Sequence, residues 1–568
     1  MITTQKGFIG LDLRKKLSDT LQSATDMLNF RVLDSGSLEK RPPIIDKFRF
    51  AGDIDGIWSG MLHGTETVAV VAAGKLYKID PTVESGDIRL IGNACYGKCK
   101  IFEFNGCLYI KSRDYYGKYD GNAIAPVEGY IPCVAISCTP SGEGEPFEQI
   151  NLLSDKRRQL FSSDGNALVY RLAEEDIDSI VSITVNGQAY GHGFTLDGGR
   201  SISFEVPPES GLNNVEITYS KAMPQKDRDR IMKCTDVMLF GGNSDGRAFL
   251  WGNEELPNHR FHSDLANGIP SVEYFPVNAF TVIGNSKINC IVQQYDKQLI
   301  FTKNEAYYSY SELRDDGMGN IVTSFPVFSL NGSKGCILRT SGCVIDNRPV
   351  TLCDDGLNTW ESTSVVNERN AICFSAPINE LINSLSPEEK EAIRIFDFQS
   401  NRELYCIVGD KAYIFNYGNG AWYCFDGFTG SIYSVCGSKL YFSNGSHLNI
   451  FGNGNSSYES TCSFQSPFIT NGQDSGNTDA CLIEADIYVK GKTTFTLEFE
   501  HQGKRTRTRR FEYPEETERF FRIALRPSLK RAMPFRIKFN AVGNGAFAVH
   551  GITIKTRKKE RSKKYGIR

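Results

Sequence analysis

One pattern of apolar and polar residues recurs along the chain. It consists of an alternating apolar run, a turn rich in Gly, Asn or Asp, and a second run that contains Tyr, Phe or Trp. Alternation over a few residues is typical of a strand with one buried face, and the turns between such runs predict hairpins. The segments that follow the pattern are 68–80, 99–120, 237–252, 288–310, 336–360, 393–425 and 431–451. Each of these segments predicts one small antiparallel sheet.

The spacing of these segments predicts how the sheets are arranged. Neighbouring segments lie about 35–55 residues apart where nothing large is inserted, and a propeller blade of four strands takes roughly 40–50 residues. One open sheet would leave long exposed edges, because twisted open sheets rarely exceed about ten strands. We therefore expect an all-β fold built on a β-propeller of six to eight blades.

Two parts of the chain depart from the blade pattern and predict further domains. Shorter runs separated by Asn-Gly, Gly-Gly and Pro-Pro predict a small inserted sandwich, and the alternating runs after residue 455 predict a second one. The expected organisation is an N-terminal arm at 1–50, first propeller blades at 51–126, an inserted β-sandwich at 127–230, remaining blades at 231–455, and a C-terminal β-sandwich with a basic tail at 456–568. One helix is expected from Ser386 to Ile395, with Ser386 as N-cap, Pro387 at the first position and Glu389 completing a capping box.

Composition agrees with this organisation and narrows the class of protein. Aromatic residues make up 11% of the chain and glycines number 53, a mixture that suits short strands and tight turns. No run approaches the roughly 20 apolar residues of a membrane-spanning helix, and residues 1–6 lack the apolar core of a signal peptide. The 16 cysteines stand singly, without a Cys-x-x-Cys pair. We expect them to be reduced, buried strand residues rather than a disulfide scaffold.

Charge is distributed unevenly along the chain. The net charge is −3, but residues 501–568 hold 20 Lys and Arg against 5 Asp and Glu, which gives +15 there and −18 for residues 1–500. A basic end on an acidic body is typical of docking on an acidic surface or a phosphate backbone. The residues that we expect to dock this chain on a partner are Lys555, Arg557, Lys558, Lys559, Arg561, Lys563 and Lys564. The alternative for this run is a solvated tail with no partner.

Two short motifs raise the question of catalysis. His259 and His262 are three residues apart, a spacing that brings two imidazoles together on a helix, but Pro257 and Asn258 predict a polar loop instead. Residues 354–360 (DDGLNTW) are similar to the Asp box of sialidases, with one residue too many between Gly and Thr, and such a box is a structural turn. The usual signatures of phosphate, zinc and serine chemistry are missing. We expect no enzyme activity, no cofactor and no metal site.

The N-terminal stretch carries a resemblance to a known family. Residues 28–32 (LNFRV), 34–37 (DSGS) and 38–42 (LEKRP) predict a strand, a tight turn at Gly36 and an extended exit at Pro42. This stretch resembles the opening of tail nozzle (tubular tail protein B-like) and tail hub proteins of short-tailed bacteriophages, the β-propeller proteins associated with packaged-DNA stabilisation. Residues 415–422 (FNYGNGAW) look like a late-blade turn of the same group, and the inserted module (VNG at 185–187, NVEITY at 214–219) agrees with it.

The resemblance implies a structural virion protein. It implies a homo-oligomeric ring, commonly a hexamer, below the portal and adaptor, whose channel retains packaged double-stranded DNA and passes it at ejection without sequence specificity. Other tail proteins would then be partners, and the protein would belong to the virion tail after assembly in the host cytoplasm. The family offers no catalytic residues.

Two other functions remain open at this stage. One is a propeller that binds or cleaves glycans, such as a phage depolymerase or a sialidase-like protein, for which the imperfect Asp box and the abundant aromatic residues speak. The other is a bacterial surface adhesin, which the missing signal peptide disfavours.

Overall fold

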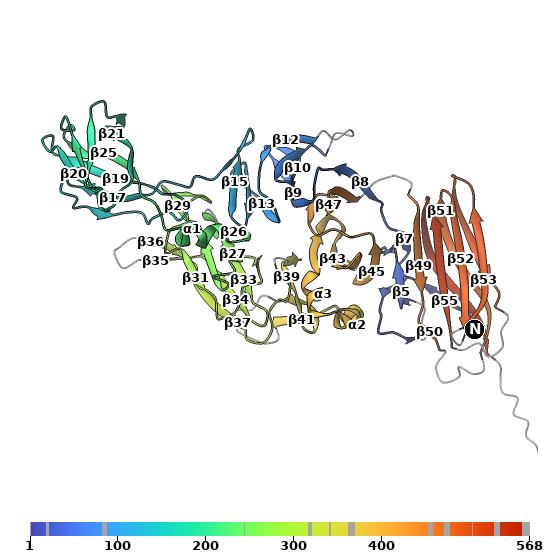
Figure 1. Ribbon diagram of the computed structural model, residues 1–568. Coiled ribbons are helices and arrows are strands. Elements are labelled where there is room, and N and C mark those ends of the chain that lie inside the picture. Colours follow the sequence, from blue (N-terminus) through green and yellow to red (C-terminus); the bar gives the residue numbers. More distant parts are fainter. Residues whose placement is uncertain are drawn as a thin grey trace, which may run out of the picture. The chain divides into compact units, whose positions relative to one another are not determined.

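The computed structural model shows a protein whose regular secondary structure is almost wholly strand (Figure 1). The structure describes residues 2–18, 22–81, 88–242, 245–315, 321–339, 342–361, 370–452, 458–470, 478–501, 504–527 and 534–558. Two compact units divide the chain. The first unit comprises Met1–Gly60 and Asn331–Arg568, and the second comprises Met61–Leu330.

Helices are few and short in both units. Among the described residues they are α1 (Gln225–Met232), α2 (Asn379–Ser384) and α3 (Pro387–Ala392), with 3-10 turns η2 (Ala376–Ile378) and η3 (Gln399–Asn401). Within the described part of the chain, none is long and apolar enough to cross a bilayer. The expectation of an all-β protein is therefore confirmed.

Most of the second unit consists of antiparallel sheets of four strands in simple up-and-down order. The first sheet holds β9 (Ile54–Leu62), in which the chain enters this unit, β10 (Thr65–Ala72), β11 (Lys75–Ile79) and β12 (Ile88–Asn93). The second holds β13 (Cys99–Phe104), β14 (Cys107–Ser112), β15 (Tyr115–Tyr119) and β16 (Ile124–Pro126). The third holds β26 (Asp236–Gly242), β27 (Asp245–Trp251), β28 (His259–His262) and β31 (Phe280–Val282). The fourth holds β32 (Cys290–Gln294), β33 (Lys297–Phe301), β34 (Ala306–Tyr310) and β37 (Val327–Asn331).

Two small hairpins accompany these sheets. They are formed by β29 (Leu265–Ala266) with β30 (Ile269–Pro270), and by β35 (Glu312–Asp315) with β36 (Ile321–Ser324).

The first unit continues the same pattern, and its last sheet takes a strand from the opposite part of the chain. One sheet holds β38 (Cys343–Ile345), β39 (Arg348–Cys353), β40 (Gly356–Trp360) and β41 (Ala371–Cys373). The next holds β42 (Arg394–Phe398), β43 (Glu403–Val408), β44 (Lys411–Asn416) and β45 (Ala421–Asp426). The last holds β46 (Tyr433–Cys436), β47 (Lys439–Asn444) and β48 (His447–Gly452), and it is completed by β8 (Ile44–Arg49), which pairs antiparallel with β48. Figure 1 shows β8 in blue beside the strands of this sheet.

Aromatic side chains pack the neighbouring sheets of the first unit against each other. Phe451 on β48 lies with its ring centroid 5.3 Å from Phe428 and 6.0 Å from Phe425 at the end of β45. All three side chains are fully buried. Removing one such ring from water stabilises the fold by about 1.5–3 kcal/mol, so these contacts hold the last two sheets together.

The segment between the second and third sheets folds around a core of its own. A six-stranded sheet is formed by β17 (Cys133–Cys138), β18 (Glu145–Pro146), β19 (Lys156–Ser163), β21 (Ser179–Val185), β22 (Gln188–Ala189) and β25 (Gly211–Ser220). A smaller sheet is formed by β20 (Val169–Arg171), β23 (Phe194–Asp197) and β24 (Ser201–Phe204). Phe161, Tyr170 and Ile217 are fully buried in one cluster that belongs to these two sheets. We call this module the inserted sandwich.

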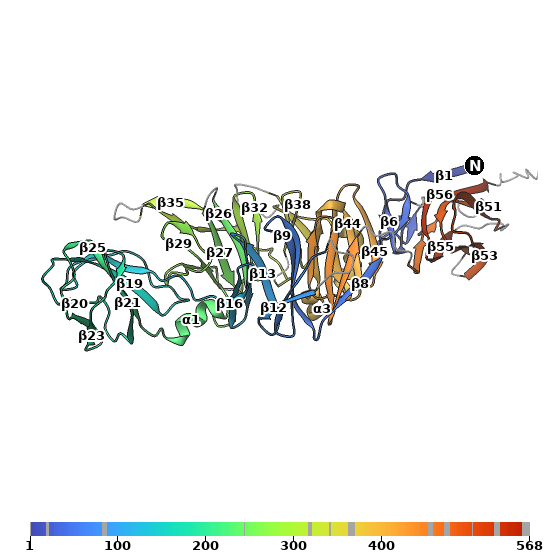
Figure 2. The same cartoon turned by 90° about the horizontal axis from the view of Figure 1, so that it is seen from above.

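Two large sheets form the C-terminal part of the first unit, and the N-terminal residues take part in both (Figure 2). One contains β51 (Thr478–Lys490), β54 (Glu518–Leu525) and β56 (Ala546–Lys558) with β1 (Ile2–Lys6), β6 (Phe30–Val32) and β7 (Leu38–Lys40). The other contains β49 (Ser460–Gln465), β50 (Phe468–Ile469), β52 (Thr493–His501), β53 (Lys504–Tyr513) and β55 (Phe535–Gly543) with β3 (Leu17–Ser18) and β5 (Asp26–Leu28). Two further short strands, β2 (Gly10–Leu11) and β4 (Ser23–Ala24), extend the sheet of β45. Residues 1–50, expected as an N-terminal arm, thus contribute strands to several sheets.

Two local predictions need correction. The helix after Ser386 has the predicted capping box, but it ends at Ala392 because Arg394 already begins β42. His259 and His262 were expected in a loop, and they lie in β28 instead, where Arg260 and Phe261 pair with Thr281 and Phe280 of β31. Of the 16 cysteines, all of them free, ten are buried, five are partly buried and Cys481 is exposed.

Candidate functional site

The family-like stretch at 28–42 folds as predicted into a hairpin. Strands β6 and β7 pair from Phe30 with Lys40 to Val32 with Leu38. Gly36 has a φ of +74°, and its N–H donates to the carbonyl of Leu33 at 2.8 Å. A positive φ is unstrained only for glycine in such a turn, which explains the residue at this position.

Asn29 begins this hairpin and ties three segments together. Its side-chain N–H donates to the carbonyl of Thr461 at 2.8 Å, and its Oδ1 accepts from Nε of Arg41 at 2.8 Å and from the backbone N–H of Asp426 at 3.1 Å. Arg41 also donates to the carboxylate of Asp426 at 3.1 Å. Because Asn29 is 1% exposed, this buried network fixes the arm against β45 and β49.

Arg31 forms the second anchor of the hairpin. Its Nε lies 2.9 Å from Oε1 of Glu403. The same carboxylate accepts hydrogen bonds from two hydroxyl groups, that of Tyr405 to Oε2 at 2.9 Å and that of Tyr423 to Oε1 at 2.5 Å. Burial disfavours the charged guanidinium, but the attraction of Glu403 more than offsets this and raises the pKa of Arg31. Tyrosine, a carboxylate and arginine are also the groups of sialidase chemistry. Here Glu403 is 1% exposed and both tyrosines are fully buried, so this cluster cannot reach a substrate.

Lys40 forms the third anchor and joins the hairpin to the C-terminal sheets. Its ammonium group donates to the carbonyls of Tyr458 at 2.7 Å, Gly543 at 3.0 Å and Gly545 at 3.1 Å. It also lies 4.0 Å from the ring centroid of Tyr458. Burial lowers the pKa of Lys40 to about 8. Three anchors of the same hairpin therefore serve the internal structure, and they make no open binding site.

The structure describes only the first part of the predicted docking run, which lies at the end of β56. Lys555 forms an internal ion pair, with its Nζ 3.1 Å from Oε2 of Glu484. The backbones of Arg557 and Lys558 pair with Asp479 and Thr478 of β51. The other predicted residues, Lys559, Arg561, Lys563 and Lys564, lie outside the described residues. The structure therefore places the start of the run in a sheet, with Lys555 already paired.

Sequence reasoning missed a second basic feature on β53. This strand carries five Lys and Arg in ten residues (KRTRTRRFEY), and the side chains of Arg507, Arg509 and Arg510 are exposed. Arg510 pairs with Glu512 at 2.8 Å. Neither Arg507 nor Arg509 has an ion-pair partner within the described residues. The alternation of arginine along a predicted strand was the signal that could have revealed this surface.

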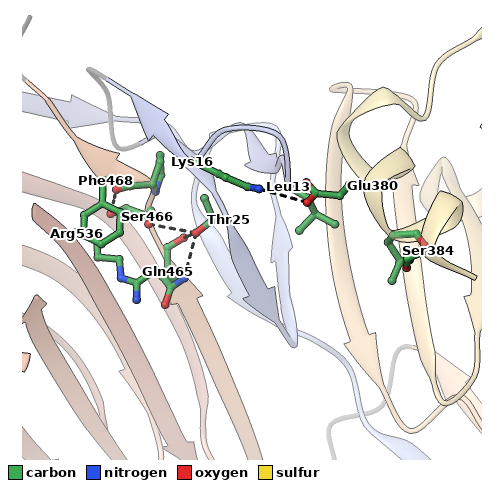
Figure 3. A pocket seen from close by; sticks show the side chains of 11 residues that line it. Leu13, Lys16, Thr25, Glu380, Ser384, Gln465, Ser466, Phe468 and Arg536 are labelled. Carbon is green, nitrogen blue, oxygen red and sulfur yellow. Dashed lines mark hydrogen bonds and ion pairs between the residues drawn. The ribbon is translucent and has the colours of Figure 1, made fainter. Parts of the chain in front are cut away.

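One cavity of about 600 Å³ lies beside the arm in the first unit (Figure 3). Its two cations are already neutralised, since Nζ of Lys16 lies 3.4 Å from a carboxylate oxygen of Glu380 and Arg536 donates to Glu500 at 2.7 Å. The guanidinium of Arg536 also lies 4.7 Å from the ring centroid of Phe468. The lining residues therefore supply apolar walls and paired charges, and we assign this cavity no chemistry.

The Asp-box-like residues form the expected structural turn between β39 and β40. Asp355 accepts from Nδ2 of Asn358 at 2.8 Å and from Nζ of Lys334 at 2.8 Å. The indole N–H of Trp360 donates to the hydroxyl of Thr351 at 2.8 Å, and the indole is fully buried. These bonds stabilise one hairpin inside the sheet, as expected of a structural turn.

The two histidines are used for packing. His259 stacks on Phe280 with ring centroids 5.6 Å apart, and His262 packs edge-on against Phe325 at 5.0 Å. Burial lowers the pKa of His262 to about 4, so the ring is neutral at physiological pH. Within the described ranges, the structure shows no group of three or more His, Cys, Asp or Glu side chains that could hold a metal ion.

Comparison with known proteins adds little to this description. No family model matches the sequence, and the curated proteins include no significant match. Among solved structures, Hsv2 of Kluyveromyces lactis is similar over 66% of this chain and 97% of its own chain, with 8% identity and a TM-score of 0.25. A TM-score this low carries no argument about fold or function.

Proposed function

We propose that this chain is a structural virion protein, a subunit of the tail nozzle or hub ring of a short-tailed bacteriophage. The single observation that carries the proposal is the family-like hairpin, because residues of the family pattern have defined roles in it: Gly36 makes the turn, and Asn29 accepts a hydrogen bond from Arg41. A resemblance that rests on residues with a defined structural role is more specific than one that rests on an arbitrary hairpin.

The proposed architecture is one propeller of seven blades. It is supported by seven antiparallel sheets, each built around one of the seven predicted segments. Six of them have four strands in up-and-down order, and in the seventh β2 and β4 extend the four strands β42 to β45. The pairing of β8 with β48 supports it further, because an N-terminal strand that completes the last sheet is how a propeller closes its ring. Such closure removes a free sheet edge.

The proposed work of this protein is to line a channel. In this proposal a homo-oligomeric ring, sixfold as is common in the family, sits below the portal and adaptor, retains packaged DNA and passes it at ejection. The acidic balance of residues 1–500 supports the idea, because an acidic wall lets phosphates slide where a basic wall would hold them. The protein would act without catalysis and without sequence-specific contacts to DNA.

Electron microscopy of virions and of the purified protein tests this proposal. We expect antibody or tag labelling at the tail, and rings with a central channel when the protein is assembled. The proposal is refuted if the protein is absent from virions and stays monomeric at high concentration. A subunit that forms rings only in contact with other tail proteins would also be monomeric when purified, but labelling would still find it in virions.

A glycan-binding function is the second candidate, and one observation favours it. Tyr308 and Tyr310 on β34 lie nearly parallel to Phe328 on β37, with ring centroids 5.3 and 5.7 Å from it. Phe328 is 40% exposed, and partly exposed aromatic rings on a sheet can stack on sugars. A polysaccharide binding and cleavage screen tests this function. Binding that is lost on Phe328→Ala, with the fold intact, would favour this candidate over the nozzle.

A further inference from the structure

Strand β53 is a long free edge of the C-terminal sheets. It pairs with β52 from Thr493 opposite Tyr513 to His501 opposite Lys504, and on its other side it has no partner strand within the described residues. A free edge of ten residues offers a row of backbone donors and acceptors to another chain. Proteins protect such edges with charge or cover them with a partner, so this edge needs an explanation.

Two arginines on this edge are exposed and have no ion-pair partner among the described residues. Arg507 and Arg509 stand opposite Phe499 and Leu497, which are fully buried, so the four side chains lie on the same face of the sheet. On this face of β53 the apolar core reaches Tyr513 and Phe511 at one end of the strand, and the face continues toward the other end as arginine. Neither guanidinium meets a carboxylate in the described part of the chain. An acidic partner surface would satisfy both of them.

The inserted sandwich carries the complementary charge. Residues 133–220 hold 13 Asp and Glu against 5 Lys and Arg, a net charge of −8 in 88 residues. Its edge strand β18 lies at the end of the six-stranded sheet. Glu143 and Glu145 are exposed there, and neither carboxylate has a hydrogen-bond or ion-pair partner among the described residues. Phe147, 59% exposed, adds an apolar contact next to them.

We propose that the β53 edge of one subunit docks on the β18 edge of the inserted sandwich of a second copy of this chain. Arg507 and Arg509 then face Glu143 and Glu145. This inference rests on the proposed homo-oligomer and names its interface. Because the two contacting surfaces differ, the contact is heterologous, and its repetition from copy to copy forms a closed ring or a filament.

Nucleic acid is the competing occupant of a basic edge, and the chemistry of the edge disfavours it. A free strand exposes carbonyl oxygens between its N–H groups, and phosphates can accept hydrogen bonds but cannot donate them. A polypeptide partner supplies both donors and acceptors as well as carboxylates. The acidic surface belongs to the same chain, so DNA would have to compete with the inserted sandwich of another copy for the β53 edge.

Charge reversal in the full-length protein tests the interface. The variants are Arg507→Glu/Arg509→Glu, the partner change Glu143→Arg/Glu145→Arg, and the combination of all four. Lys490→Glu/Lys492→Glu is the matched control, because these two exposed lysines flank Gly491 at the opposite end of β52 from Arg507. Circular dichroism confirms folding, and sedimentation velocity measures self-association at low and high salt.

We expect each double reversal to weaken self-association at least about tenfold, since attraction becomes repulsion, and the fourfold variant to restore it. The control should associate as the unchanged protein does, and added salt should weaken association. The inference is overturned if the arginine variant associates normally, if the unchanged protein stays monomeric, or if the variant loses only binding to non-specific duplex DNA. None of these results decides the virion proposal, which labelling of tails tests separately.

Discussion

Replacement of Arg31 by methionine tests whether the family-like hairpin is held by its buried ion pair. The side chain of Glu403 is 1% exposed and that of Arg31 is 15% exposed, so the change leaves a carboxylate buried without its cation. Removing one partner of a buried pair costs about 3–5 kcal/mol. The hydroxyls of Tyr405 and Tyr423 still donate to Glu403, which places the expected loss near the lower limit, about 3 kcal/mol.

Chemical denaturation followed by tryptophan fluorescence measures this loss. Arg14→Met is the matched control, because Arg14 makes an ion pair with Asp12 at 2.9 Å but is 54% exposed, and exposed pairs contribute about 0–1 kcal/mol. The double variant Arg31→Met/Glu403→Gln should recover about half of the loss, since it removes the stranded charge. An Arg31→Met variant no less stable than Arg14→Met would refute the anchor role.

Three further predictions follow from single features of the structure. His262 has a pKa of about 4 when folded against 6.5 when unfolded, so only the unfolded chain binds a proton between these values. Stability should therefore fall by up to about 3 kcal/mol as pH drops from 6.5 to 4, and His262→Phe should flatten that part of a melting-temperature profile. Phe48→Ala in β8 should cost about 3 kcal/mol in denaturation, because Phe48 is 8% exposed, whereas Lys47→Ala beside it should change stability by less than about 0.5 kcal/mol. Truncation after Lys558, which keeps β56 whole, should leave a folded protein that assembles poorly into particles. Normal infectivity of phage that carry the truncated form would exclude docking by residues 559–568.

Local patterns predicted most of the strands. Each of the seven predicted segments coincides with hairpin strands of one antiparallel sheet, because alternation and turn residues act over a few positions of the chain. The capping box at Ser386 was equally visible. The same reasoning missed β8, whose partner β48 lies about 400 residues further along the chain. Pairing at that distance leaves no mark on the neighbouring residues of either strand.

The candidate sites, too, were predictable only where they depend on neighbouring residues in the sequence. The hairpin at 28–42 was predicted from its turn, but the buried roles of Arg31 and Lys40 depend on distant residues such as Glu403 and Gly545. The HRFH motif was misjudged because Pro257 and Asn258 predict a loop, and pairing with β31 overrides that local preference. Lys555 appeared free in the sequence, and only strand register shows Glu484 beside it.

The shared strands of residues 1–50 have a consequence for synthesis on the ribosome. Strand β8 emerges about 400 residues before β48, a delay of roughly 20–80 seconds at about 5–20 residues per second. During that time its apolar side chains have no sheet to join, and neither have those of β6 and β7. The nascent chain must therefore keep its first strands from pairing with one another or with neighbouring chains. Refolding from denaturant should be slow for the same reason, since the pairs that join the two ends of the first unit close the longest loops.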